Sequence, residues 1–184
     1  MRNFKYSQKE NSFLEKIFTW LGSILLFPAM LYFYFNIGNY LLIDYLNLLI
    51  HEGGHGIFRV FGGFIYTLGG TLMQIIIPTM FIIFYSIKKI KIGAQIFLVW
   101  LGQSLFNISV YASDARAQKL PLLGGSKVYH DWTYILNKLN LLEHDKTIGS
   151  VFVFLGVAAF LIALIIPLLI KKENEKTIDL NLDL

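Results

Sequence analysis

Two histidines and a glutamate lie near the middle of an apolar segment that is long enough to cross a membrane. The segment covers about residues 41–61, and its run from His51 to His55 has the form H-E-x-x-H, with Glu52 in second place. Residues four apart are neighbours on one face of a helix, so the two imidazoles could bind the same metal ion. Ionisable groups are costly in hydrocarbon and usually serve a function there. This helix must therefore turn its polar face toward protein or water.

The composition is that of an integral membrane protein. Of the 184 residues, 55% are hydrophobic and 15% are charged, and the mean hydropathy is +0.58. Soluble domains contain about 25% charged residues. Cysteine is absent, so a zinc site must use histidine and carboxylate ligands. The net charge of +4 is spread through loops and tails without a basic helix face or an RNA-binding motif, and we expect no nucleic-acid partner.

The apolar runs predict an all-α integral membrane bundle of about five transmembrane helices. These spans are expected at about residues 20–37, 41–61, 71–87, 92–111 and 148–170. A polar N-terminal tail (1–17) and a polar C-terminal tail (171–184) would flank a single domain at 18–170. Between the second and third spans, the glycine pairs of the segment 62–70 predict a short hairpin or a re-entrant loop.

An amphipathic helix is expected after the fourth span. Asp131 has the character of its N-cap. The apolar side chains that follow share one face, which consists of Trp132, Ile135, Leu136, Leu139 and Leu142. A helix of this kind suits the membrane surface.

The distribution of positive charge predicts the orientation. With five spans, ten of the sixteen Lys and Arg residues lie on the same side as the N-terminus. Cytoplasmic loops carry an excess of these residues, so we expect a multi-pass protein of the cytoplasmic membrane with its N-terminus in the cytoplasm. Membrane lipids are then its immediate partners, and a homo-oligomer is compatible with the sequence.

Polar side chains form a stripe on each of two predicted spans. At about 100° per residue, the polar face of the second span contains Asp44, Asn47, His51 and His55. The polar face of the fourth span contains Gln103, Asn107 and Asp114. Lipid cannot satisfy such groups, so the two stripes should face each other or a wet cavity. Hydrogen bonds to neighbouring helices alone would also account for Gln103 and Asn107.

The third metal ligand has three candidates. Catalytic zinc usually has three protein ligands and one open position. Asp114 is the first choice, because it ends the polar stripe of the fourth span. His130 and Asp131 are the alternatives, in a loop that could fold back into the cavity, although a helix cap explains Asp131 equally well. Pairing of Asp114 with Arg116 would argue against Asp114 as a ligand.

These residues resemble those of the site-2 protease family of intramembrane zinc metalloproteases, particularly its small bacterial members without a PDZ domain. The resemblance covers about residues 41–131. It rests on the H-E-x-x-H motif in a spanning helix, the glycine-bracketed segment 62–70, and a later span with Asn107 and Asp114. The family's aspartate usually lies in an Asp-Gly pair after an Asn-Pro element, whereas here Asp114 precedes Ala115.

The resemblance implies a zinc-dependent endopeptidase that cleaves transmembrane or membrane-proximal proteins. His51 and His55 would bind zinc together with a distant aspartate, and Glu52 would be the general base, within a core of three spans. Asn107 is a candidate donor to the developing oxyanion. The segment 62–70 could hold an extended substrate along a strand edge.

Two other functions are compatible with the same motif. The first is a membrane zinc hydrolase that acts on a lipid or a small amide. The second is a non-catalytic membrane protein with a structural or sensing zinc ion, which would normally have four protein ligands.

Overall fold

The computed structural model describes residues 9–121 and 129–170, with side chains from residue 17 onward except residue 18. Within these ranges the chain is all-α and contains no strand. The α-helices are α1 (Lys9–Phe35), α2 (Leu42–Phe58), α3 (Gly63–Ile87), α4 (Lys91–Ser113), α5 (Asp131–Lys138) and α6 (Asp145–Leu169). Short 3₁₀ turns, η1 (Arg59–Phe61) and η3 (Leu142–His144), precede α3 and α6. The predicted C-terminal tail, 171–184, lies outside the described residues.

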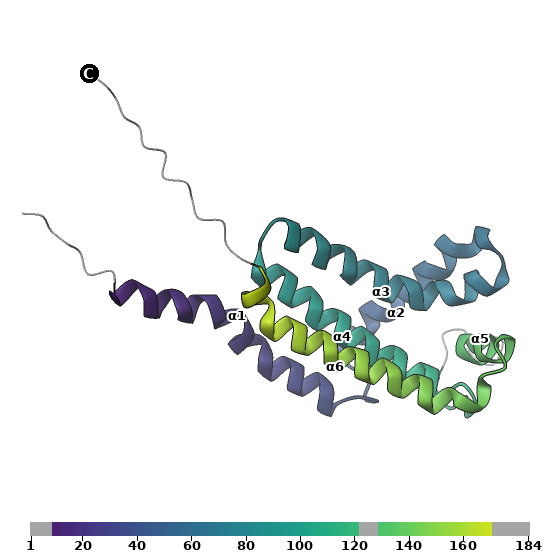
Figure 1. Ribbon diagram of the computed structural model, residues 1–184. Helices are drawn as coiled ribbons and strands as arrows, with labels where there is room; N and C mark the ends of the chain where they lie inside the picture. The colour runs from purple at the N-terminus through teal and green to yellow at the C-terminus, as the bar shows by residue number, and fades with distance from the viewer. Residues whose placement is uncertain (1–8, 122–128, 171–184) are drawn as a thin grey trace, which may run out of the picture.

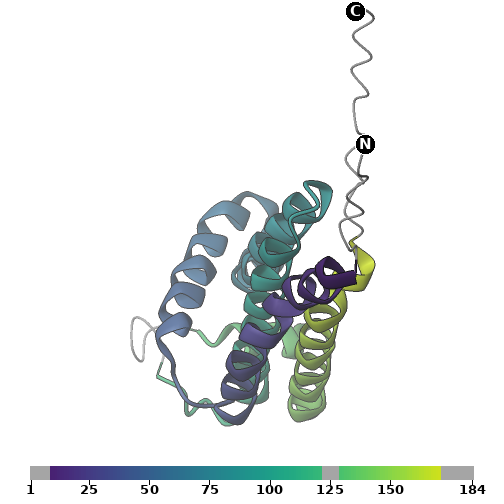
Figure 2. The same cartoon turned by 90° about the vertical axis from the view of Figure 1, so that its left-hand side faces the viewer.

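Four long helices lie side by side in the order α2, α3, α4 and α6 (Figure 1 and Figure 2). The central helix, α4, packs against α3 on one side and against α6 on the other. The purple helix α1 lies against α4 and α6, and the short helix α5 lies near the ends of α3 and α4. This arrangement leaves α2 at the edge of the row, where it packs mainly on α3.

Three helices are long and apolar enough to cross a membrane, as expected for a multi-pass membrane protein. They are Gly63–Ile87, Lys91–Ser113 and Leu142–Leu169. Only 28% of the apolar stretch of the first and 33% of that of the third is buried inside the protein. Their remaining apolar surface faces outward, where lipid would cover it.

The other two predicted spans are shorter. The apolar part of α1 is Thr19–Phe35, and α2 contains 17 residues. The first helix also begins earlier than predicted, at Lys9, within the segment expected to be a polar tail. Residues 1–8 of that tail lie outside the described residues.

The predicted hairpin or re-entrant loop at residues 62–70 is wrong. Gly62 has a φ of +86°, which turns the chain, and α3 begins at the next residue. The second glycine pair lies within α3 and against α2, where a Cβ atom on Gly70 would lie 2.5 Å from the ring of His51. These glycines therefore allow two helices to pack closely, instead of forming a turn.

The predicted amphipathic helix after the fourth span is present as α5, which ends at Lys138, and its apolar face packs on the protein. Trp132, Ile135 and Leu136 are buried against residues of α4 that include Leu105 and Ile108. This packing fixes α5 above one end of α3 and α4. Its first residue, Asp131, is thereby held close to α2.

Candidate metal centre

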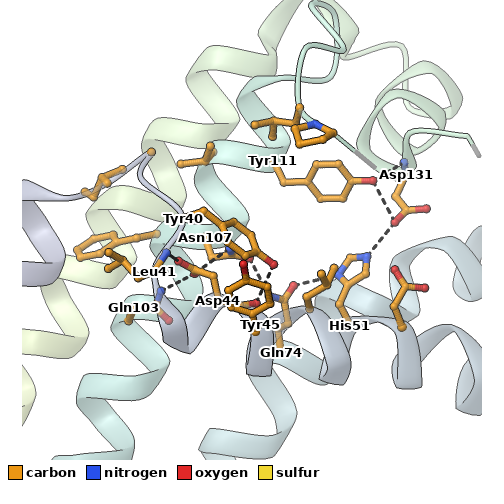
Figure 3. Close-up of a pocket in the computed structure, with 18 of the residues that line it drawn as sticks. Tyr40, Leu41, Asp44, Tyr45, His51, Gln74, Gln103, Asn107, Tyr111 and Asp131 are labelled. Atoms are coloured by element: carbon orange, nitrogen blue, oxygen red, sulfur yellow. Dashed lines mark hydrogen bonds and ion pairs between the residues drawn. The ribbon is translucent and has the colours of Figure 1, made fainter. Parts of the chain in front are cut away.

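The two motif histidines and one aspartate from another helix converge on a common point. His51 and His55 lie one turn apart on α2, with ring centroids 4.8 Å apart. Asp131 Oδ2, at the start of α5, lies 2.9 Å from His51 Nε2 and 3.2 Å from His55 Nε2. Figure 3 shows the Asp131 carboxylate pointing toward His51 across the pocket. Of the described residues, these three form the one group of His, Asp and Glu close enough to hold a metal ion.

The hydrogen bonds around the histidines leave three acceptor atoms facing one another. His55 Nδ1 lies 2.8 Å from the backbone oxygen of Tyr66, which can only accept, so Nδ1 carries the proton. His55 Nε2 then presents a lone pair toward Asp131. His51 is held in the same way by the side-chain oxygen of Gln74, which lies 3.0 Å from its Nδ1. Two nitrogen lone pairs and a carboxylate oxygen repel unless a proton or a metal ion lies between them.

The three donor atoms lie within 4.8 Å of one another, close enough to hold a metal ion, and zinc is one ion that accepts histidine and carboxylate ligands. Zinc binds histidine nitrogen and carboxylate oxygen at about 2.0–2.2 Å, so neighbouring ligand atoms in a tetrahedron lie about 3.3 Å apart. The distances of 2.9 and 3.2 Å from Asp131 to the two imidazoles are close to that value. Hydrogen bonds from Nδ1 to an oxygen acceptor are also the usual outer-shell support of zinc-bound histidine.

Asp131 is free to face the histidines because another residue caps α5. The N-cap is His130, whose ring accepts a hydrogen bond from the backbone N–H of Thr133 at 3.3 Å, so the predicted capping role of Asp131 is wrong. Burial raises the pKa of the Asp131 carboxyl, but in the protein without metal the hydrogen bonds that protonated His51 and His55 can donate outweigh this effect and hold the pKa at about 2. Asp131 is therefore an anion at neutral pH.

Tyr111 holds Asp131 in place from α4. Its hydroxyl group accepts a hydrogen bond from the Asp131 backbone N–H at 3.2 Å and donates one to Oδ2 at 3.4 Å. The tyrosine ring lies against the ring of His130, with centroids 4.3 Å apart. A residue of the central helix thus links the third member of the group to the core.

Asp114, the first choice for the third ligand, lies outside the group. Its two oxygens accept hydrogen bonds from the backbone N–H groups of Lys119 and Leu120, at 3.0 and 2.9 Å. One of them also lies 3.5 Å from His130 Nε2. His130, another candidate ligand, faces Asp114 and not the two motif histidines. Burial lowers the pKa of its imidazole. The geometry therefore favours Asp131, and Asp114 instead binds the backbone that follows α4.

Arg116 does not pair with Asp114. Its guanidinium group lies 2.7 Å from an oxygen of Asp145 and 3.0 Å from one of Glu143. These contacts tie the end of α4 to the start of α6. The ion pair between Arg116 and Asp114, which would have argued against Asp114 as a ligand, is absent. The Asp114 carboxylate is instead occupied by the backbone N–H groups of Lys119 and Leu120.

Glu52 is exposed and faces the same cavity as the two histidines. The cavity has a volume of about 1050 Å³ and lies between α2 and α4, whose backbones lie apart and are joined by polar side chains. Glu52, His51, His55 and Asp131 all line it. No hydrogen bond or ion pair joins the Glu52 carboxylate to another residue of the described ranges. The carboxylate is therefore available to a molecule that enters the cavity.

The two polar stripes face each other, as predicted, except at Asp114. Gln103 Nε2 donates to Asp44 Oδ1 at 2.7 Å, and Asn107 Nδ2 donates to the same oxygen at 2.9 Å. Asn47 Nδ2 donates to Gln103 Oε1 at 2.6 Å. Asn107, predicted as an oxyanion donor, thus uses one of its N–H groups to bind Asp44.

Sequence reasoning missed three supporting residues. Gln74 had a visible signal, because it is a polar amide inside an apolar span, like Gln103. Tyr111 had a weaker one, as an aromatic residue with a polar group at the end of a span. The backbone oxygen of Tyr66 had no signal, because every residue has such an oxygen and the sequence does not show which one faces His55.

Comparisons of the chain with family models, with curated proteins and with solved structures found no match. The site-2 protease family is thus a resemblance carried by the motif and its setting. The case for function rests on the geometry of the centre.

Proposed function

We propose that this protein is a zinc-dependent intramembrane endopeptidase. The observation that carries the proposal is the convergence of His51 Nε2, His55 Nε2 and Asp131 Oδ2 in the cavity that Glu52 also lines. Two histidines and a carboxylate form a ligand set known from zinc peptidases, and the following glutamate supplies their general base. The resemblance to site-2 proteases points to the same activity.

The number of ligands favours a catalytic site over a structural one. Structural zinc sites are closed by four protein ligands, whereas catalytic sites have three and an open position. Within the described part of the chain, the group contains three residues and no fourth. A bound zinc ion would supply Lewis acidity there, polarising a carbonyl group and acidifying a water molecule.

Glu52 is the candidate general base. It lies one residue, or about 100° of helix, from His51, which directs its carboxylate into the cavity beside the two imidazoles. From there it can take a proton from the attacking water and deliver it to the leaving nitrogen. Asn107 retains one N–H that could donate to a developing oxyanion. Gln74 lies between Asn107 and His51.

The setting of α2 supports cleavage within the membrane. This helix carries the histidines and packs on α3, which is long enough to cross a membrane. If α1 and α2 also span, the protein has the five spans expected from its sequence. The N-terminus would then lie in the cytoplasm, and the centre would lie at membrane depth.

The cavity favours an extended substrate. Its lining extends from Leu41, the N-cap of α2, to His55, a distance of about 21 Å along the helix axis. An extended peptide rises about 3.3 Å per residue, so about six residues would fit along it. Because the segment 62–70 is helical, substrate would be held by the walls of the cavity and not by a strand edge.

The experiment uses purified protein in lipid vesicles loaded with zinc. Peptides with a transmembrane segment, phospholipids and small amides serve as separate substrates, and Glu52→Gln with equal zinc content is the control. Zinc-dependent cleavage of a peptide bond, lost in the control, supports the proposal. Hydrolysis of lipid or amide alone would assign the site to the second class of reaction. Zinc binding without hydrolysis of any of the three would overturn the enzymatic assignment.

A further inference from the structure

A chain of buried side chains connects His51 to a carboxylate on the same helix. His51 Nδ1 lies 3.0 Å from Gln74 Oε1, and Gln74 Nε2 donates to Asn107 Oδ1 at 2.9 Å. Asn107 Nδ2 in turn donates to Asp44 Oδ1 at 2.9 Å. Figure 3 shows this path from His51 through Gln74 and Asn107 to Asp44. Asp44 lies seven residues before His51, about 10 Å along α2, so it has no direct contact with the metal centre.

The polarity of this chain is fixed at its far end by two groups that can only donate. The backbone N–H of Leu41 donates to Asp44 Oδ2 at 2.7 Å. The indole N–H of Trp100 donates to Asn47 Oδ1 at 3.0 Å. Asn47 must therefore offer its amide nitrogen to Gln103, which must offer its own to Asp44.

Asp44 consequently receives donors at both oxygens and acts as an acceptor throughout. Asn107 must then present its nitrogen to Asp44 and its oxygen to Gln74. Gln74 must present its nitrogen to Asn107 and its oxygen to His51. Nδ1 of His51 thereby carries a proton, so the neutral ring has its lone pair on Nε2, toward Asp131.

We propose that Asp44 is a positioning residue that fixes the tautomer of His51 through Asn107 and Gln74, so that the neutral ring presents Nε2 to a metal ion. The proposal rests on the metal centre of the proposed function. It explains why a carboxylate with 3% exposure is present on a helix set in apolar surroundings, remote from the metal ligands. His55 needs no such device, because the backbone oxygen of Tyr66 orients its ring.

The test compares zinc affinity in variants of Gln74 that differ in their acceptor. Gln74→Met keeps the length of the side chain but removes the acceptor for His51, whereas Gln74→Glu retains it. Outer-shell partners of metal-bound histidine typically contribute about 10–100-fold in metal affinity. Competition with a chromophoric chelator should show a loss of about that size in Gln74→Met, a smaller loss in Asp44→Asn, and affinity near that of wild type in Gln74→Glu.

Gln95→Met is the matched control. Gln95 is also a buried glutamine, with 1% exposure, and it donates to Ser23 and to the backbone of Ala163, away from the centre. Loss of zinc affinity in Gln74→Met but not in Gln95→Met supports positioning of His51. Equal losses in both would assign Gln74 a merely structural role, and unchanged affinity in a folded Gln74→Met would overturn the proposal.

Nitrogen NMR of histidine in the wild-type protein gives a second measurement that needs no variant. The proposal requires Nδ1 of His51 to carry the proton and Nε2 to bind zinc. A ring with its proton on Nε2, or with zinc on Nδ1, would overturn it. If the protein binds zinc with this pattern but hydrolyses nothing, the enzymatic function fails and the positioning role stands; if it binds no zinc, both fail.

Discussion

Gly53 and Gly54 are adjacent in the motif but have opposite surroundings, so replacing each by alanine should have opposite effects. A Cβ atom on Gly53 would meet nothing within 4 Å. A Cβ atom on Gly54 would lie 2.3 Å from the backbone oxygen of Gly69 in α3. One substitution therefore adds a methyl group in open space, and the other places it against the backbone of the neighbouring helix.

The size of the Gly54 effect follows from this contact. An ordinary distance between carbon and a carbonyl oxygen is about 3.3–3.6 Å, so α2 would have to move about 1 Å away from α3. Overpacking of this kind typically costs about 1–3 kcal/mol. The movement also exceeds the tolerance of about 0.2 Å on metal–ligand distances, and it shifts His51 and His55 relative to Asp131. We expect Gly54→Ala to lower both the stability and the zinc affinity, the latter by at least about tenfold.

Gly53→Ala should instead stabilise the protein. Alanine is favoured over glycine in a helix by about 1 kcal/mol, and nothing opposes the new methyl group. Thermal unfolding in detergent, with zinc and with chelator, measures stability, and competition with a chelator measures affinity. Equal behaviour of the two variants, or wild-type stability and affinity in Gly54→Ala, would refute the close approach of α2 and α3.

The remaining predictions concern the ligands and the base. Elemental analysis should show about one zinc per wild-type chain and loss of most of it in His51→Ala and His55→Ala; retention in both would contradict the site. Asp131→Asn should lose zinc while Asp114→Asn keeps it, since only the first carboxylate faces the imidazoles; the reverse result would restore Asp114 as the ligand. Glu52→Gln should keep the zinc but lower hydrolysis by about 10²–10⁴-fold, as expected for a general base, and activity within tenfold of wild type would exclude that role.

Helical periodicity accounts for the parts of the centre that could be predicted. His51 and His55 were recognised because their spacing matches one turn of a helix. The facing stripes of α2 and α4 were predicted for the same reason, and Asp44 does bind Gln103 and Asn107. Periodicity shows which residues share a face of one helix. It predicts contacts with a second helix only where both have polar faces that lipid cannot satisfy.

The prediction for segment 62–70 was wrong because paired glycines occur both in turns and at close contacts between helices. Paired glycines indicate a turn in soluble proteins, whereas in membrane helices small residues mark a close contact. Gly62 fits the first reading, with its positive φ, and Gly70 fits the second, beside His51. The partner helix decides between them, and a single segment does not reveal its partner.

The sequence left three candidates for the third ligand, because the choice among them depends on which residue caps a short helix. An aspartate at the start of α5 has the signature of an N-cap, and that role would turn its carboxylate toward its own backbone. Here His130 caps the helix from the preceding position, with its ring toward Thr133. Asp131 is moved into the first turn, where burial of Trp132 on the core and the hydroxyl group of Tyr111 direct it toward α2. A shift of one residue in the helix start thus converts a capping residue into a candidate metal ligand.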